Sequence, residues 1–284
     1  MPEERLLPVS NRLARLTWLL ISGLLALALA ASPARAADQA PLDLRYGVYW
    51  AGLQIATLKL KHEIAPAGYS AKLVVETVGL TERLVRYRAR TLAAGEVAPD
   101  RSLLPTSFSS EYQTRKKARR SVVTFDPASG DVVDLAISKR GEPDRSKVPE
   151  ELRKGVIDPL SAFLGIREHV AAMRPGVPYR APVFDGRRRY DLEARVVGHD
   201  RATVAGREQP VLRVALIATF LAGADPDDLD EITSDAERVR FELLLSDDER
   251  LRPLQMRMLD SLLPATIELL QDCSGEAGCQ LAAN

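Results

Sequence analysis

The sequence predicts a mainly β protein, with a curved antiparallel sheet or incomplete β-barrel and one principal helix at about residues 158–173. Three observations support this fold class. Short runs of alternating apolar and polar residues recur from residue 42 onward, which is the pattern of half-buried strands. Turn-forming residues separate these runs at short intervals, which favours an antiparallel meander. One segment combines apolar residues at helical spacing with start and stop signals.

The first half of the chain contains regular strand patterns. Strands are expected within Leu42–His62, where Gly47 and Gly52 mark a bend or bulge. Pro66-Ala-Gly68 is a turn signal. The charged segment Lys139–Lys154 is expected to be an exposed loop. Between these two segments, strand patterns occur at Tyr69–Thr77, Leu84–Leu92, Thr106–Thr114, Arg119–Phe125 and Val132–Ser138.

The predicted helix has clear boundaries. Asp158 supplies an acceptor for the first free backbone N–H groups, and Pro159 suits the first helical position because it has no N–H. Arg174-Pro-Gly176 ends the helix. Its apolar stripe consists of Leu160, Phe163, Leu164 and Val170.

Strand patterns resume after the helix. Asp185-Gly186 lies between two of them and is a strong hairpin signal. Gly198-His-Asp200 is interpreted as a turn, and the acidic run Asp225–Glu231 as a surface loop. The expected strands are Tyr179–Phe184, Tyr190–Val197, Val211–Thr219, Arg238–Leu245, Leu251–Met258 and Thr266–Leu270.

Residues 1–36 have the organisation of a secretory signal peptide. Three arginines precede the apolar run Leu16–Ala31, and Ala34-Arg-Ala36 provides small residues for cleavage after Ala36. The alternative is an uncleaved anchor, but the run is shorter than the roughly 20 apolar residues that a spanning helix needs. No cysteine near Ala36 could carry a lipid anchor, and no later segment is apolar enough to span a membrane. We therefore expect residues 37–284 to form a single β-rich domain free in the periplasm.

The expected mature chain is nearly neutral. Residues 37–284 carry 35 basic and 37 acidic residues, a net charge of −2. Such a balance does not suit nucleic-acid binding, which requires a basic surface.

Both cysteines lie near the end of the chain, at Cys273 and Cys279. In an oxidising compartment this spacing predicts a disulfide that clips the tail locally. A redox or metal pair is the alternative. Redox pairs usually have two intervening residues, and no histidine is close enough in sequence to complete a zinc site.

Residues able to carry chemistry are few and scattered. His62 is expected near the exposed face of its strand, His169 near the end of the helix, and His199 in a turn, so no metal site or catalytic role is expected. The acidic runs Asp227-Asp228 and Asp247-Asp-Glu249 suit solvated turns. No nucleophile motif or phosphate-binding loop occurs, so we expect no cofactor and no enzymatic activity.

The basic run Arg115-Lys-Lys-Ala-Arg-Arg120 lies between two predicted strands and has two interpretations. It could keep a sheet edge soluble and discourage strand addition, which we favour. It could instead bind anionic groups of the cell envelope.

The order and spacing of several short motifs resemble a known family. These motifs are Tyr46–Gly52, Asp158-Pro-Leu-Ser161, Phe184-Asp-Gly186 with Tyr190 and Leu192, Ala205-Gly206, Ser246-Asp-Asp248 and Arg252-Pro-Leu254. Together they resemble the exported bacterial family known as domain of unknown function 3108. The resemblance implies a curved antiparallel sheet or incomplete barrel in the periplasm of Gram-negative bacteria, with no established activity and no functional residues to transfer. The Cys273/Cys279 pair is not part of this pattern.

Two functions fit these expectations. The first is a non-enzymatic binding or carrier protein that holds an apolar, lipid-like envelope ligand, provided that the helix acts as a lid rather than a plug. The alternative is an envelope assembly factor that engages a protein partner through a sheet edge or the basic hairpin. An exported hydrolase would be a third class, but no motif supports it.

Overall fold

The computed structural model describes residues 41–65, 68–172, 176–223, 238–260 and 265–275. Its strands form one antiparallel sheet that does not close, in the order β8-β7-β6-β5-β4-β3-β2-β1-β14-β13-β12-β11-β10-β9. The first arm of the sheet contains β1 (Leu42–Trp50), β2 (Leu53–Ala65), β3 (Gly68–Thr77), β4 (Arg88–Val97), β5 (Leu103–Gln113), β6 (Ala118–Phe125), β7 (Val132–Lys139) and β8 (Glu142–Asp144). The second arm contains β9 (Tyr179–Phe184), β10 (Arg189–Val204), β11 (Arg207–Ala222), β12 (Arg238–Ser246), β13 (Pro253–Met258) and β14 (Ala265–Asp272).

The two arms join at a seam between the first and last of these strands. β1 pairs with β14 from Leu44, opposite Asp272, to Trp50, opposite Ala265. Every other pairing joins strands that are consecutive in sequence. The seam is therefore the long-range pairing that turns two meanders into one sheet.

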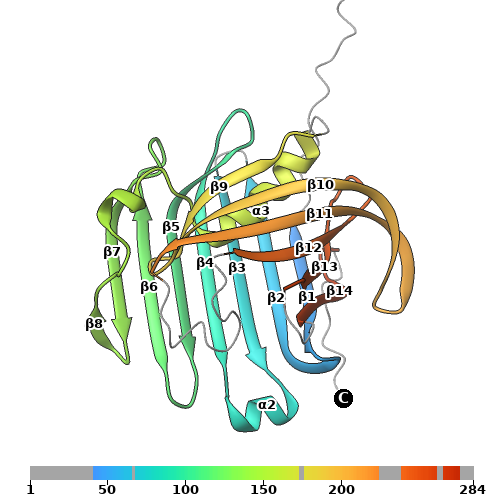
Figure 1. Ribbon diagram of the computed structural model, residues 1–284, viewed down its shortest axis with the longest axis horizontal. Helices are drawn as coiled ribbons and strands as arrows, with labels where there is room; N and C mark the ends of the chain where they lie inside the picture. Colours follow the sequence, from blue (N-terminus) through green and yellow to red (C-terminus); the bar gives the residue numbers. More distant parts are fainter. Residues whose placement is uncertain (1–40, 66–67, 173–175, 224–237, 261–264, 276–284) are drawn as a thin grey trace, which may run out of the picture. The chain divides into compact units, whose positions relative to one another are not determined.

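The helix α3 (Pro159–Ala172) lies between the two arms, and β10–β12 cross in front of the first-arm strands (Figure 1). Residues 160–168 of this helix are all buried except Phe163, which is half-buried. Leu160 and Leu164 pack into the core of the first arm, and Ile166 packs into that of the second. Because its side chains are buried against both arms, α3 is a plug between them and not the lid that the carrier interpretation assumes.

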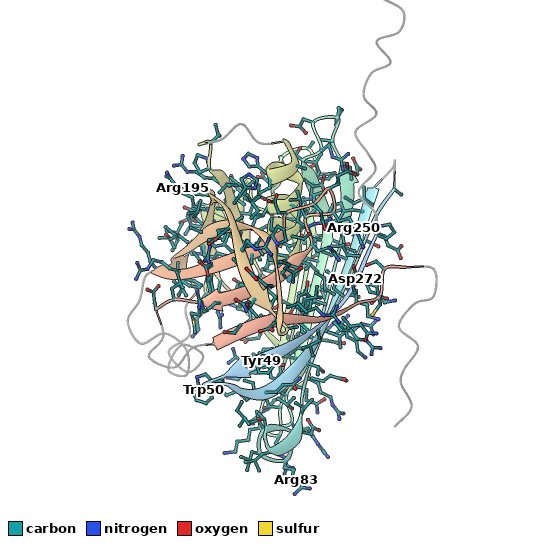
Figure 2. The ribbon with its side chains drawn as sticks, turned by 90° about the vertical axis from the view of Figure 1, so that its right-hand side faces the viewer. Tyr49, Trp50, Arg83, Arg195, Arg250 and Asp272 are labelled. Carbon is teal, nitrogen blue, oxygen red and sulfur yellow. The ribbon has the colours of Figure 1, made fainter. Side chains whose placement is uncertain are left out.

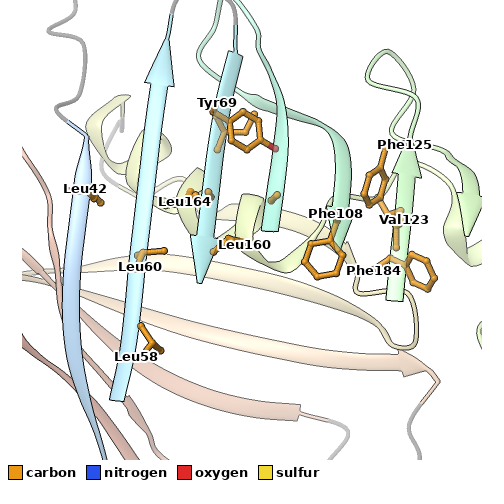
Figure 3. Close-up of a cluster of buried hydrophobic side chains, with 14 of the residues drawn as sticks. Leu42, Leu58, Leu60, Tyr69, Phe108, Val123, Phe125, Leu160, Leu164 and Phe184 are labelled. Carbon is orange, nitrogen blue, oxygen red and sulfur yellow. The ribbon is translucent and has the colours of Figure 1, made fainter. Parts of the chain in front are cut away.

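Alternation along the first-arm strands builds the main core. Leu58 and Leu60 of β2 face inward, and Tyr69, Phe108 and Val123 join them from β3, β5 and β6 (Figure 3). Side chains on a strand alternate between the two faces of a sheet. The intervening lysines of β2 consequently face outward.

Gly165 allows close contact between α3 and the second arm. A Cβ atom at this position would lie 2.5 Å from the Tyr179 hydroxyl oxygen. Tyr179 is also packed against the core cluster around Ile166. A glycine in mid-helix is unfavourable by roughly 1 kcal/mol relative to alanine, so its presence here reflects packing.

The mainly β fold, the open antiparallel sheet and the principal helix are confirmed, and Asp185-Gly186 forms the β9–β10 turn. Three local predictions are wrong. The strand expected from Leu84 begins only at Arg88, because Gly79–Leu84 forms the short helix α2. The turn expected at Gly198-His-Asp200 lies inside β10, where a bulge after Val196 accommodates the glycine.

The third wrong prediction is that Lys139–Lys154 is an exposed loop. It contains β8 and the 3-10 helix η1 (Glu150–Arg153), and Val148 within it is buried. Three predicted features lie outside the described residues. They are the signal peptide, the Pro66-Ala67 part of the predicted turn, and the acidic loop Asp225–Glu231. Within the described ranges, no helix is long and apolar enough to cross a membrane.

Candidate binding cleft

A cleft of about 330 Å³ lies where the inner face of the first arm meets the first turn of α3 and strands β12–β14. Most of its lining is apolar, and it comes from all three regions. The apolar lining residues include Leu58, Leu60, Leu73, Phe108, Pro159, Leu160, Phe163, Leu243, Met256 and Ile267. Their convergence produces a concave apolar surface, the usual character of a small-molecule site.

The cleft exists because the inner face of the sheet extends beyond the part that α3 covers. Along β3, Tyr69 and Ala71 are buried, but the next inward residues, Leu73 and Val75, are only half-buried. Phe163 is likewise half-buried on an otherwise buried stretch of helix. Inward side chains that keep accessible surface indicate space that the protein does not fill.

A few polar groups are set into this apolar surface. Thr91 and Ser110 lie opposite each other on β4 and β5. Gln255 donates to Glu268 Oε2 at 3.3 Å, and Asp185 Oδ1 accepts from the backbone N–H of Arg187 at 2.8 Å. Tyr46 also lines the cleft and donates to the Pro253 carbonyl oxygen at 2.9 Å. Sparse polar groups on an apolar wall can orient a ligand without dominating its binding.

The start of α3 is held by a buried polar network. Asp158 Oδ1 accepts the backbone N–H groups of Leu160 and Ser161, both at 2.9 Å, so the predicted N-cap is present. The Ser161 hydroxyl donates to Asp158 Oδ2 and also bonds the Tyr69 hydroxyl at 2.5 Å. This chain of bonds ties α3 to β3 beside the cleft.

Burial shapes the ionisation of this network. It raises the pKa of Asp158 to about 6, although the Ser161 hydroxyl and two backbone N–H groups act in the opposite direction. Burial also raises the pKa of Tyr69 well above its usual range. A nucleophilic serine is usually activated by a histidine or lysine base, whereas the hydroxyl of the fully buried Ser161 bonds a carboxylate and a phenol. The network is therefore architectural.

A second buried polar cluster lies near the other end of α3. Arg167 is almost fully buried and donates to the backbone carbonyls of Leu251 at 3.1 Å and Arg250 at 2.7 Å. Its Nη1 lies 3.4 Å from His62 Nδ1. Burial and the neighbouring Arg167 charge lower the pKa of His62 to about 4, so the imidazole is neutral at pH 7.

The expectation that His62 lies near the exposed face is wrong. It shares the inward parity of Leu58 and Leu60, and its exposed fraction is 2%. His169 contacts the Tyr179 ring, and His199 Nδ1 lies 2.9 Å from Asp247 Oδ2.

The three histidines are on β2, α3 and β10, and the described residues contain no group of three or more His, Cys, Asp or Glu arranged to hold a metal ion. Asp247-Asp-Glu249 lies in the turn after β12, whereas Asp227-Asp228 is outside the described residues.

The basic run Arg115–Arg120 forms a hairpin, but not at a sheet edge. Arg115-Lys-Lys117 is the turn, whereas Arg119 is buried on the inner face of β6. β5 and β6 are each paired on both sides. The favoured interpretation, protection of a sheet edge, is therefore wrong.

Cys273 is buried beside the seam, and its backbone N–H donates to the Asp43 carbonyl at 2.7 Å. Cys279 lies outside the described residues, so the predicted disulfide stays a prediction.

Comparison with known proteins supports the fold and the sequence resemblance. The family model for a protein of unknown function (DUF3108) matches residues 45–268. A β-barrel-like protein of domain of unknown function DUF1849 from Brucella abortus superposes with a TM-score of 0.51 at 11% identity, covering 82% of this chain and 97% of that one. A protein provisionally described as a lipoprotein, from Parabacteroides distasonis, gives a TM-score of 0.32 at 7% identity, covering 83% and 96%. No curated protein matches the sequence.

Proposed function

This chain belongs to the DUF3108 family, whose function is unknown, and we propose that it is an exported, periplasmic, non-enzymatic protein that binds an apolar, lipid-like ligand of the cell envelope. The observation that carries the proposal is the cleft beside the first turn of α3. Its volume of about 330 Å³ is at the lower end of the range for small-molecule sites. That size favours a single hydrocarbon chain as the bound part of the ligand.

The helix supports this function as a fixed wall. α3 is a buried plug, so no lid movement is required to create the space. The bonds from Asp158 and Tyr69 to Ser161 hold the first turn in place. Leu160 and Phe163 consequently present a preformed apolar surface, and a preformed site binds with a smaller loss of conformational entropy.

Lipid extraction and probe binding test the proposal directly. Protein purified without detergent should release an apolar compound that mass spectrometry detects after solvent extraction. After delipidation, the protein should bind a fluorescent fatty-acid probe. A preparation that yields no extractable lipid and leaves the probe unbound would contradict the proposal.

Two adjacent residues of β3 provide a matched pair of variants. Leu73 faces the cleft, whereas Val74 faces outward, and both are half-buried. Leu73→Trp should fill the cleft and weaken probe binding by about tenfold or more, equivalent to about 1.4 kcal/mol. Val74→Trp adds similar bulk to the opposite face and should leave probe affinity unchanged. Equal effects from the two variants would mean that the probe binds elsewhere.

The partner-protein alternative has weaker support at the sheet edges. The outer edge of β9 is occupied at its Pro182–Phe184 end, because Phe184 N–H donates to the Ile157 carbonyl and Ile157 N–H to that of Pro182, both at 2.9 Å. At the other edge, β8 has only three residues. Strand addition needs a row of available backbone groups, so the cleft is the better-supported site.

A further inference from the structure

One end of the first arm combines exposed apolar side chains with basic ones. We define the α2 tip as residues 78–87, 114–117 and 140, the turns beyond β3, β5 and β7 (Figure 1). Leu80, Leu84 and Val85 are exposed there, by 64%, 67% and 42%. The turn between β1 and β2 flanks the tip and exposes Trp50 and Leu53. Five of the twelve large apolar residues exposed in the described structure thus lie on these neighbouring turns.

Hydrogen bonds join these turns into one surface. The Val78 N–H donates to the Ile55 carbonyl at 3.0 Å, which attaches the start of α2 to β2. The Arg115 N–H donates to the Val85 carbonyl at 3.1 Å, which attaches the basic hairpin to the end of α2. Arg140 then donates to the Lys116 carbonyl at 3.0 Å. The apolar and basic parts therefore keep a fixed relation to each other.

The charge of the α2 tip is strongly positive. Its one acidic residue is Glu82. That carboxylate accepts from Thr77 Oγ1 at 2.7 Å and from Arg88 at 3.3 Å, and it also lies 3.6 Å from Arg86 Nε. Figure 2 shows Arg83 at the lower extremity of the molecule. The basic residues of the tip are Arg83, Arg86, Arg115, Lys116, Lys117 and Arg140.

We propose that the α2 tip docks the protein onto the surface of an anionic lipid bilayer. Single exposed apolar residues are normal on soluble proteins, but a cluster rimmed by polar groups marks an interaction site. Interfacial binding has two components. Apolar side chains such as leucine enter the acyl boundary, and arginines and lysines above them contact anionic headgroups. Trp50 on the flanking turn is a residue type that favours the membrane interface. Charge complementarity therefore selects an anionic membrane as the occupant.

This inference is independent of what occupies the cleft. Vesicle binding could fail in a protein that still binds the fatty-acid probe, and the reverse is equally possible. If both hold, the α2 tip places a lipid-binding protein at the source or destination of its ligand.

Vesicle co-sedimentation tests the docking surface. The purified protein should sediment with vesicles of phosphatidylcholine mixed with phosphatidylglycerol, and weakly with phosphatidylcholine alone. Binding should fall as the salt concentration rises, because screening shortens the reach of surface charges to about 3 Å at 1 M. No sedimentation with the anionic vesicles, or equal binding to both kinds, would overturn the proposal.

Matched variants separate the two components. Arg83→Gln/Lys116→Gln should weaken partitioning by about 30-fold, because each basic residue at an anionic surface contributes about 1 kcal/mol. Exposed basic residues away from the tip provide the control, Lys154→Gln/Arg207→Gln, which should bind like the wild type. Leu80→Ser/Leu84→Ser should also weaken partitioning by at least about tenfold. Val133→Ser/Val197→Ser removes apolar residues of similar exposure elsewhere and should have no effect.

Solution size distinguishes a bilayer from a second copy of the chain. The protein should be monomeric in sedimentation velocity without vesicles, with or without Leu80→Ser/Leu84→Ser. A dimer that this double variant converts to monomers would assign the tip to self-association and overturn the membrane proposal. All the substituted side chains are exposed, so circular dichroism should confirm that the variants fold as the wild type does.

Discussion

The two ends of α3 lie in contrasting surroundings. At the first turn, Leu160 and Phe163 border an unfilled apolar cleft, and the polar side chains of Asp158 and Ser161 are bonded. Toward the last turns, the long side chain of Arg167 fills the space between the arms. There, buried polar atoms such as His62 Nε2 and Glu168 Oε1 have no hydrogen-bond partner among the described residues.

The difference separates an end of α3 that fills the space between the arms from an end that leaves space beside it. A buried arginine bonded to two backbone carbonyls fixes the position of α3 between the arms. A cavity, by contrast, reduces stability, because side chains around it lose contacts. The space retained beside a fixed helix is the space that the proposed ligand would fill.

The largest effect is expected from removing Arg167. Arg167→Ala would leave the carbonyls of Arg250 and Leu251 without their donor, so we expect a loss of about 3–5 kcal/mol in unfolding free energy. Urea denaturation measures this loss. Arg207→Ala, at the exposed first position of β11, should change stability by less than about 0.5 kcal/mol. A loss below about 1 kcal/mol in Arg167→Ala would show that the charged end does not anchor the helix.

Acid should destabilise the protein through His62. Burial and Arg167 lower its folded-state pKa to about 4, below the ordinary value of 6.5. The unfolded state therefore binds the proton first, and the contribution of His62 is lost as pH falls from about 6.5 through 4. The loss should reach about 3 kcal/mol at pH 4, measured by urea denaturation across this range. His62→Gln should flatten the profile, and an unchanged acid slope in that variant would refute the assignment.

Protonation of Asp158 should stabilise the folded protein, the opposite of the effect of His62, over an overlapping pH range. Its folded-state pKa of about 6 exceeds the ordinary 3.8, so its protonation favours the folded state as pH falls from about 6 to 4. Asp158→Asn should remove this compensation and steepen acid destabilisation. Asp158→Ala also removes the helix cap and should lose about 2 kcal/mol at pH 7. If Asp158→Asn left the acid profile unchanged, the buried carboxylate would not titrate as stated.

Local signals in the sequence predict the elements well. Asp158-Pro159 marks the start of α3, and Asp185-Gly186 marks a hairpin, because both signals act over a few residues. The sequence does place His62 on the buried face of β2, since His62 continues the inward alternation of Leu58 and Leu60. The sequence around Leu84 is harder to interpret, because the isolated exposed leucines of the short helix α2 resemble the alternation of a strand.

The cleft could not be predicted in this way. Its walls combine Leu60, Phe163 and Met256, which are far apart in sequence and meet only because β1 pairs with β14 and the second arm folds over α3. No local pattern specifies that pairing. The half-burial of Leu73 likewise depends on where α3 begins over the sheet, which sequence periodicity does not encode.

The smallest expected effect is a difference in stability between variants of two neighbouring residues on α3. Leu164 is fully buried, and Leu164→Ala should lose about 3 kcal/mol. Phe163 borders the cleft and is already half-exposed, so Phe163→Ala should lose only about 1 kcal/mol despite removing more atoms. Thermal melts with and without a saturating fatty-acid probe sharpen the contrast, because a ligand stabilises only the state that binds it. The probe should raise the melting temperature of Leu164→Ala as it does that of the wild type, and have less effect on Phe163→Ala. A larger loss of the probe effect in Leu164→Ala than in Phe163→Ala would show that the ligand does not bind against Phe163 in the cleft.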